Sequence, residues 1–246
     1  MLRTRSRLIA APLAAAALTL TVAGYAGAAD SSSSGSTGKS SASTASAPCL
    51  ADATTLIGDL DGDGNPDKIS NPGHTGTKMT VQWGTADGTF GKKNAVRDLI
   101  GAKKGEDASA AVADFQNDGT LDIVVNIVKQ ADGDDPSSAR LSEYRPGPVS
   151  RKDLTSPDGV HSDIGDRGEV RELSIAQYNG DEYPDLAVLN NSGDGQMDRD
   201  PRLSKPGGGL EGYDYDAYLK YGEFGTWSEP PAMPKDGWSQ FYKSCS

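Results

Sequence analysis

Residues 59–67 read Asp-Leu-Asp-Gly-Asp-Gly-Asn-Pro-Asp, and two later stretches repeat their pattern of oxygen-bearing side chains. Residues 114–122 read Asp-Phe-Gln-Asn-Asp-Gly-Thr-Leu-Asp, and residues 177–185 read Gln-Tyr-Asn-Gly-Asp-Glu-Tyr-Pro-Asp. Each stretch has such side chains at positions 1, 3, 5 and 9, and short apolar segments typical of strands lie on both sides. The starts are 114 − 59 = 55 and 177 − 114 = 63 residues apart, which indicates a repeated supersecondary unit.

The oxygen-bearing side chains of these three turns predict calcium sites. Ca²⁺ takes about six to eight oxygen ligands, and a tight turn whose alternate side chains point inward supplies several of them from one segment. The predicted ligands are Asp59, Asp61, Asp63, Asn65 and Asp67 in the first turn, Asp114, Gln116, Asp118, Thr120 and Asp122 in the second, and Gln177, Asn179, Asp181, Tyr183 and Asp185 in the third. The residue at position 7 of each turn would contribute its backbone carbonyl.

The three turns differ in charge and in the residue at their sharpest point. The first turn has four carboxylates among these positions, the second three and the third two, so we expect two to three ions and an affinity that falls in that order. Gly64 and Gly119 stand at position 6, where a positive φ is needed, but the third turn has Glu182 there. The alternative for each turn is an acidic hairpin without metal. An EF-hand is excluded because position 12 is never Glu.

A second signature alternates with these turns. Residues 81–91 read Val-Gln-Trp-Gly-Thr-Ala-Asp-Gly-Thr-Phe-Gly, an aliphatic strand followed by a glycine-rich turn, and degenerate copies lie at 140–147 and 218–227. Together the two signatures resemble FG-GAP repeats, also called VCBS repeats, over about residues 50 to 230. The resemblance implies a β-propeller like the N-terminal region of the integrin α-chain, in which each repeat forms one four-stranded blade.

The number of repeats limits the number of blades. The segment 49–246 has 246 − 48 = 198 residues and three clear repeats, enough for three to four blades, whereas propellers usually close with about four to eight. We therefore expect an all-β, propeller-like array that is incomplete or is closed by its termini. A degenerate fourth blade within 190–246, an open array and a ring built from several chains are the alternatives. One short helix is expected at 94–104.

Two cysteines bracket the repeats, Cys49 and Cys245, separated by 245 − 49 = 196 residues. An even number of cysteines in a secreted chain favours a disulfide, although two unrelated thiols are the alternative. A disulfide would bring the two ends of the domain to within about 7 Å of each other.

The N-terminal segment resembles a targeting signal. Residues 1–29 contain three arginines, an apolar run at 8–22 and small residues at 26–29, which predicts a cleaved secretory signal peptide rather than a membrane anchor. Residues 30–48 are rich in Ser, Ala and Gly and predict a flexible linker before the repeat domain at 49–246. We therefore expect a secreted, extracellular protein with no transmembrane span.

Composition narrows the function. The chain has 24 basic and 35 acidic residues, a formal net charge of −11, which argues against nucleic acid as a partner. Two histidines leave little room for a His-based triad or a multi-His zinc site. The leading hypothesis is a calcium-stabilised, non-catalytic binding or adhesion module for an extracellular protein or carbohydrate.

Two other functions remain open at this point. One is a secreted enzyme that acts on polysaccharide, or an accessory carbohydrate-binding protein, using acidic loop residues. The other is a passive component of an assembly, a homo-oligomer if the propeller is incomplete. The loop 190–216, with the nearby Tyr213, Tyr215 and Tyr218, is either a ligand surface or the packed edge of a blade.

Overall fold

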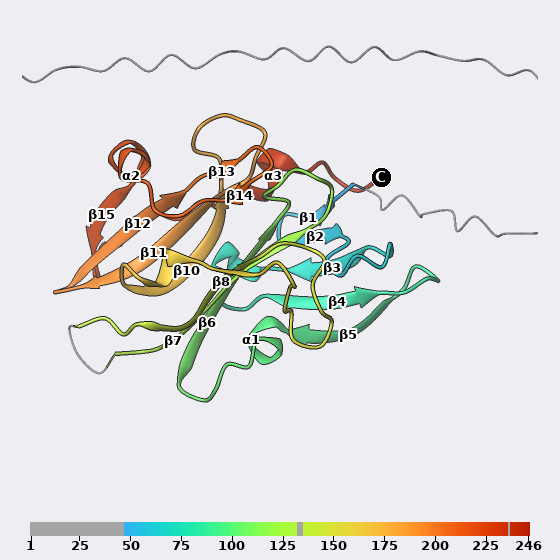
Figure 1. Cartoon of the computed structure of the whole chain (residues 1–246), viewed down its shortest axis with the longest axis horizontal. Helices are drawn as coiled ribbons and strands as arrows, with labels where there is room; N and C mark the ends of the chain where they lie inside the picture. Colours follow the sequence, from blue (N-terminus) through green and yellow to red (C-terminus); the bar gives the residue numbers. More distant parts are fainter. Residues whose placement is uncertain (1–46, 132–134, 236) are drawn as a thin grey trace, which may run out of the picture. The chain divides into compact units, whose positions relative to one another are not determined.

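The computed structural model describes residues 47–131, 135–235 and 237–246. All of them belong to one compact unit, Ala42–Ser246. Within this part of the chain, three antiparallel sheets of four or five strands follow one another along the sequence, as the colours of Figure 1 show, and a two-stranded hairpin makes a fourth. The expected all-β, propeller-like architecture is therefore confirmed.

The strands of each sheet lie almost entirely in chain order. The first sheet contains β1 (Cys49–Asp52), β2 (Thr55–Gly58), β3 (Asp67–Ser70), β4 (Thr80–Gly84) and β5 (Phe90–Ala95). The second contains β6 (Glu106–Ala113), β7 (Asp122–Lys129), β8 (Ala139–Arg145) and β9 (Val160–His161). The third contains β10 (Glu169–Ala176), β11 (Asp185–Gly193), β12 (Gln196–Arg202) and β15 (Glu223–Thr226). A separate hairpin joins β13 (Ser204–Lys205) to β14 (Gly209–Leu210).

The helices of the described residues are short. They are α1 (Val96–Leu99), α2 (Tyr215–Tyr221) and α3 (Gly237–Phe241), with 3-10 turns at Pro72–His74 and Asp163–Gly165. No helix in the described part of the chain has the length and apolar character that crossing a membrane requires.

Each of the three Asp-rich turns occupies the same place in its sheet. The turn 59–67 joins β2 to β3, 114–122 joins β6 to β7, and 177–185 joins β10 to β11. The apolar segments that the sequence placed beside the turns are these strands. Their side chains build one continuous core across the three sheets, because β7 and β11 are buried along nearly their whole length.

A loop from the first sheet ties the other two sheets together. The carbonyl of Gly76 accepts the N–H of Ala110 in β6 at 3.1 Å, and the carbonyl of Thr75 accepts the N–H of Leu173 in β10 at 3.0 Å. Gly76 has a φ of +74°, and a Cβ there would lie 2.3 Å from the carbonyl oxygen of Ala110. Only glycine therefore lets this loop reach both strands.

The two ends of the domain meet, as the cysteines predicted. Cys49 and Cys245 form a disulfide with a Cα–Cα distance of 5.0 Å. Leu50 in β1 donates its N–H to the carbonyl of Lys243 at 2.8 Å and accepts the N–H of Cys245 at 2.8 Å. Trp238 of α3 is buried, and its Nε1–H donates to the carbonyl of Val112 in β6 at 2.8 Å. The C-terminal segment thus links the first sheet to the second.

The region after residue 190 departs from the sequence-based expectations. It forms no fourth four-stranded sheet among the described residues, because it supplies β12 and β15 to the third sheet, the β13–β14 hairpin, α2 and α3. The predicted third copy of the second signature, at 218–227, is wrong because residues 215–221 form α2. Asp214 caps this helix by accepting the N–H of Asp216 at 2.8 Å.

The helix expected at 94–104 is shorter than predicted. β5 continues to Ala95, and α1 ends at Leu99, before Gly101 and Gly105 adopt positive φ angles of 75° and 82°. The predicted signal peptide at 1–29 lies outside the described residues, as does the predicted linker at 30–48 except for its last two residues.

Candidate metal centre

The last residue of each turn is an aspartate that the fold buries. Asp67, Asp122 and Asp185, the ninth-position aspartates, are 0%, 1% and 0% exposed. One oxygen of each carboxylate accepts the N–H at position 2 of its own turn, at 2.9, 3.0 and 2.8 Å (donors Leu60, Phe115 and Tyr178). Each aspartate begins a strand (β3, β7 or β11), and its other oxygen accepts an N–H from the end of the following strand (β4, β8 or β12) or from just after it. These hydrogen bonds measure 2.7, 2.9 and 3.0 Å, with Gly84, Gly147 and Ser204 as donors. Each carboxylate therefore fastens its turn to the neighbouring strand end.

This fastening explains the glycine in the second signature. A Cβ at Gly84 would lie 2.3 Å from the carbonyl oxygen of Pro66, and one at Gly147 would lie 2.5 Å from that of Leu121. Both glycines thus allow the close approach that their N–H bond to the buried aspartate needs. After β12 of the third sheet Ser204 stands at this place, so no glycine marks the repeat there.

Burial makes the ninth-position carboxyls weaker acids. Loss of water around them raises the pKa of Asp67 and of Asp185 to about 6, and that of Asp122 to about 7, against the opposing effect of the backbone N–H donors. Neighbouring carboxylates of the same turn add to the rise, for example Asp114 and Asp118 beside Asp122. A cation bound in the turn would favour the ionised form of these groups.

The first residue of each turn shapes the loop. Asp59 accepts the N–H groups of Gly62 and Gly64, both at 2.8 Å. Asp114 does the same in the second turn, from Asp118 at 2.9 Å and from Gly119 at 2.7 Å. In the third turn the first residue is neutral, and the side-chain oxygen of Gln177 accepts the N–H of Gly180 at 2.8 Å.

The first turn gathers three carboxylates. Asp59, Asp61 and Asp67 each offer an oxygen within 4.8 Å of the others, and among the described residues they are the one group of three acidic, His or Cys side chains so close. Two oxygens on one Ca²⁺ are at most about 5 Å apart, since each lies about 2.3–2.6 Å from the ion. Hard carboxylate oxygens at this separation fit a calcium ion.

The remaining predicted ligands of the first turn lie outside that group of three. Asp63 accepts the N–H of Asn65 at 2.8 Å, and its carboxylate is bonded to the guanidinium of Arg151.

Arg151 contacts the first turn in a way that the sequence did not reveal. It lies in the loop after β8, and its guanidinium bonds both Asp61 and Asp63 while standing 5.8 Å from the centre of the Trp83 ring. Because this contact joins residues 88 and 90 positions apart, no local motif marks it. With four carboxylates and one guanidinium, the turn retains a charge of −4 + 1 = −3.

The first turn also lies against the second sheet through its backbone. The carbonyl of Asp59 accepts the N–H of Leu121 at 3.2 Å, and the carbonyl of Leu60 accepts the N–H of Val149 at 3.0 Å. The carboxylate cluster therefore stands at the junction of two sheets, where a bound ion would act on both.

The second and third turns are less complete as ligand sets. In the second, Asp114, Asp118 and Asp122 do not form such a group of three, and Asp118 accepts the N–H of Thr120 at 2.8 Å. The predicted ligands of the third turn hydrogen-bond to one another, with Asn179 donating its side-chain N–H to the carboxylate of Asp181 at 2.6 Å. Metal binding at Gln116, Thr120, Gln177, Tyr183 and the other positions of these two turns stays a prediction.

The tyrosines after residue 210 are mostly packed. The Tyr213 ring lies 3.8 Å from the guanidinium carbon of Arg167, and the Tyr218 hydroxyl donates to Asp198 at 3.3 Å. Tyr215 is 62% exposed. The packed blade edge is thus the better description of Tyr213 and Tyr218.

Comparison with known proteins identifies the repeat. Residues 57–125 match the family model of the FG-GAP-like repeat. The match begins in β2 and ends in β7, so it contains the first and second Asp-rich turns and the signature at 81–91. Neither a curated protein nor a solved structure matches the chain.

Proposed function

This chain is an FG-GAP repeat protein, and we propose that it is a secreted, non-catalytic binding module whose Asp-rich turns hold Ca²⁺. The observation that carries the proposal is the group of Asp59, Asp61 and Asp67, whose oxygens lie within 4.8 Å of one another. The first turn is the principal site, and the second and third are weaker sites.

Calcium in the first turn would strengthen the junction of two sheets. The excess charge of the turn repels itself and opposes folding, and a divalent ion offsets it. The same ion would shift Arg151 away from Asp61 and Asp63, because the guanidinium and the ion interact with the same carboxylates. The role of the metal is then to stabilise the scaffold that presents a binding surface.

Two observations support a secreted, non-catalytic module. The Cys49–Cys245 disulfide is typical of an oxidising compartment outside the cytoplasm. Each ninth-position aspartate already accepts two backbone N–H groups, which suits it to holding a turn rather than to moving protons.

Calcium titration tests the proposal. Isothermal titration of the metal-free protein should show Ca²⁺ binding that Asp61→Asn weakens by about tenfold or more. Asp158→Asn, which removes the same charge from an exposed loop residue, should leave the binding unchanged. Equal effects of the two substitutions, or no binding at all, would refute the calcium site.

Incubation with common polysaccharides checks the absence of catalysis. The calcium-loaded protein should release no new reducing ends or unsaturated sugars from them. Product that accumulates in proportion to the protein concentration would show instead that the module is an enzyme.

A further inference from the structure

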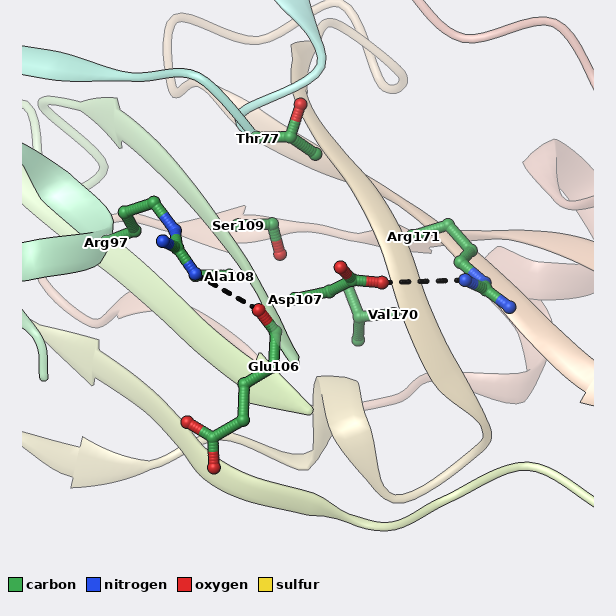
Figure 2. Close-up of a pocket in the computed structure, with 8 residues that line it drawn as sticks. All are labelled: Thr77, Arg97, Glu106, Asp107, Ala108, Ser109, Val170 and Arg171. Carbon is green, nitrogen blue, oxygen red and sulfur yellow. Dashed lines mark hydrogen bonds and ion pairs between the residues drawn. The ribbon is translucent and has the colours of Figure 1, made fainter. Parts of the chain in front are cut away.

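A cavity of about 370 Å³ lies where all three sheets meet. Its walls come from Thr77 before β4, Arg97 of α1, the start of β6 and the start of β10 (Figure 2). The Asp-rich turns follow the opposite ends of β6 and β10. Asp107 in the cavity and Asp114 in the second turn are seven residues apart on one strand, or about 23 Å at about 3.3 Å per residue. The cavity is therefore separate from the second and third Asp-rich turns.

Arg97 supplies hydrogen-bond donors on one wall. Its side chain is held by one hydrogen bond of 3.2 Å from Nη2 to the carbonyl oxygen of Glu106, as the dashed line in Figure 2 marks. A guanidinium has five N–H donors. No ion pair joins Arg97 to a carboxylate in the part of the chain that the structure describes, so it remains open to an anionic group.

Ser109 supplies a second donor that has no acceptor. Its side chain is 4% exposed, it lines the cavity, and its hydroxyl has no hydrogen-bond partner. Buried hydroxyls are nearly always hydrogen-bonded, because an unpaired one costs folding free energy. The hydroxyl oxygen is itself buried, so a ligand oxygen in the cavity would satisfy it after a rotation of the Ser109 side chain.

Asp107 brings a negative charge to the same cavity. Its side chain is 54% exposed, and its ion pair with Arg171 is a long 3.6 Å. Arg171 lies closer to Glu169, at 3.1 Å. Figure 2 shows the Asp107 carboxylate between Arg97 and Arg171. A simple anion bound to Arg97 would be repelled by Asp107, and a simple cation bound to Asp107 would be repelled by Arg97.

We propose that this cavity binds a small zwitterion of the amino-acid type. The ligand carboxylate accepts hydrogen bonds from Arg97 and Ser109, and the ligand ammonium donates to Asp107. Val170 and Ala108 supply apolar surface for a short side chain. The cavity volume lies in the range of about 300–1,000 Å³ that is usual for small-molecule sites. The proposal rests on the proposed function in treating the domain as a binding module, but it does not require calcium in the turns.

Titration with L-alanine tests the charge requirement. Isothermal titration of the full chain in saturating Ca²⁺ should show that L-alanine binds, and that acetate and ethylamine, which carry one charge each, bind at least about tenfold more weakly. If acetate binds as well as L-alanine, the cavity is a plain anion site and the proposal is wrong. Absence of L-alanine binding to the folded protein would equally overturn it.

Variants with matched controls test the residues. Arg97→Gln and Asp107→Asn should each weaken L-alanine binding by about tenfold or more, whereas the exposed controls Lys92→Gln and Asp158→Asn should not change it. Ser109→Ala should weaken binding while the melting temperature holds or rises, since the unpaired hydroxyl is removed. A fall in melting temperature with unchanged binding would assign Ser109 to the fold alone.

The two proposals can fail separately. Loss of the L-alanine signal with a normal response of the melting temperature to chelator would overturn the cavity proposal and leave the calcium sites in place. If L-alanine binds but the melting temperature does not respond to chelator, the calcium proposal is overturned and the cavity proposal remains.

Discussion

Replacing the buried Asp122 with alanine should destabilise the protein far more than replacing an exposed aspartate of the same turn. The Asp122 carboxylate accepts N–H bonds from Phe115 at 3.0 Å and Gly147 at 2.9 Å, and the hydroxyl bond of Tyr144 at 3.0 Å. Asp122→Ala leaves all three donors without this acceptor inside the core. A buried donor without a partner costs about 1–3 kcal/mol, so the loss is at least about 3 kcal/mol. That is a large fraction of the about 5–15 kcal/mol that keeps a typical domain folded.

Urea denaturation in the presence of chelator measures this loss without a contribution from metal binding. The free energy of unfolding, from the transition midpoint and slope, should fall by at least about 3 kcal/mol for Asp122→Ala. Asp122→Asn should lose less, because the amide keeps one acceptor oxygen.

Asp118→Ala is the matched control, since Asp118 is an exposed aspartate of the same turn that accepts one N–H, from Thr120 at 2.8 Å. Its loss should stay near or below about 1 kcal/mol. If Asp118→Ala and Asp122→Ala destabilise the protein equally, the role given to the ninth-position aspartates is wrong.

Three further perturbations test other parts of the structure. Arg151→Gln removes the guanidinium that competes with Ca²⁺ for Asp61 and Asp63. Titration should therefore show a Ca²⁺ affinity that is higher by about two- to tenfold. An unchanged or lower affinity would contradict the competition. The variant with both Cys49→Ser and Cys245→Ser should have a free energy of unfolding lower by up to about 5 kcal/mol in urea denaturation, because the disulfide closes a loop across 196 residues. A loss near zero would show that the disulfide adds little stability. In chelator, the melting temperature should fall as the pH rises from about 5 to about 8. The reason is that the pKa values of the ninth-position aspartates in the folded state, about 6 and 7, exceed the ordinary value of 3.8. The protonated carboxyls therefore stabilise the folded state at low pH, and this stabilisation is lost as the pH rises through those values. Saturating Ca²⁺ should remove or reverse this trend, since the ion binds the ionised carboxylates, and a melting temperature that rises with pH in chelator would refute the assignment.

The sequence was sufficient for the elements that local patterns determine. The strands on either side of each Asp-rich turn, the repeat itself and the Cys49–Cys245 disulfide follow from residue types and their spacing, and the structure has all of them. The geometry of the turns also follows locally, because Gly64 and Gly119 adopt the positive φ angles, 82° and 92°, that their position requires.

The rest depends on contacts between distant residues. Arg151 reaches the first turn from the loop after β8, and no pattern near Arg151 or near Asp61 indicates the pairing. Ser204 after β12 takes the place that glycine has in the first two sheets, so the sequence placed the glycine of that repeat unit 222 − 204 = 18 residues too late, at Gly222. The helix α2 begins at its N-cap residue Asp214. Aspartate is equally common in turns and loops, so the sequence alone did not predict the helix.

The ninth-position aspartates show the same limit. Their spacing predicts metal ligands, and only the fold reveals that each also accepts two backbone N–H groups, one from its own turn and one from the end of a neighbouring strand or just after it. A single residue type at a single spacing thus serves both the turn and the sheet.

The most direct test of calcium binding is thermal melting of the protein after metal analysis, with and without chelator. A ligand that binds only the folded state adds about 2.7 kcal/mol of stability at a hundredfold excess over its Kd. We expect purified protein to contain calcium and its melting temperature to fall by several degrees when chelator removes the ion, and to recover on adding Ca²⁺. A metal-free protein whose melting curve is the same with chelator and with Ca²⁺ would contradict the central claim.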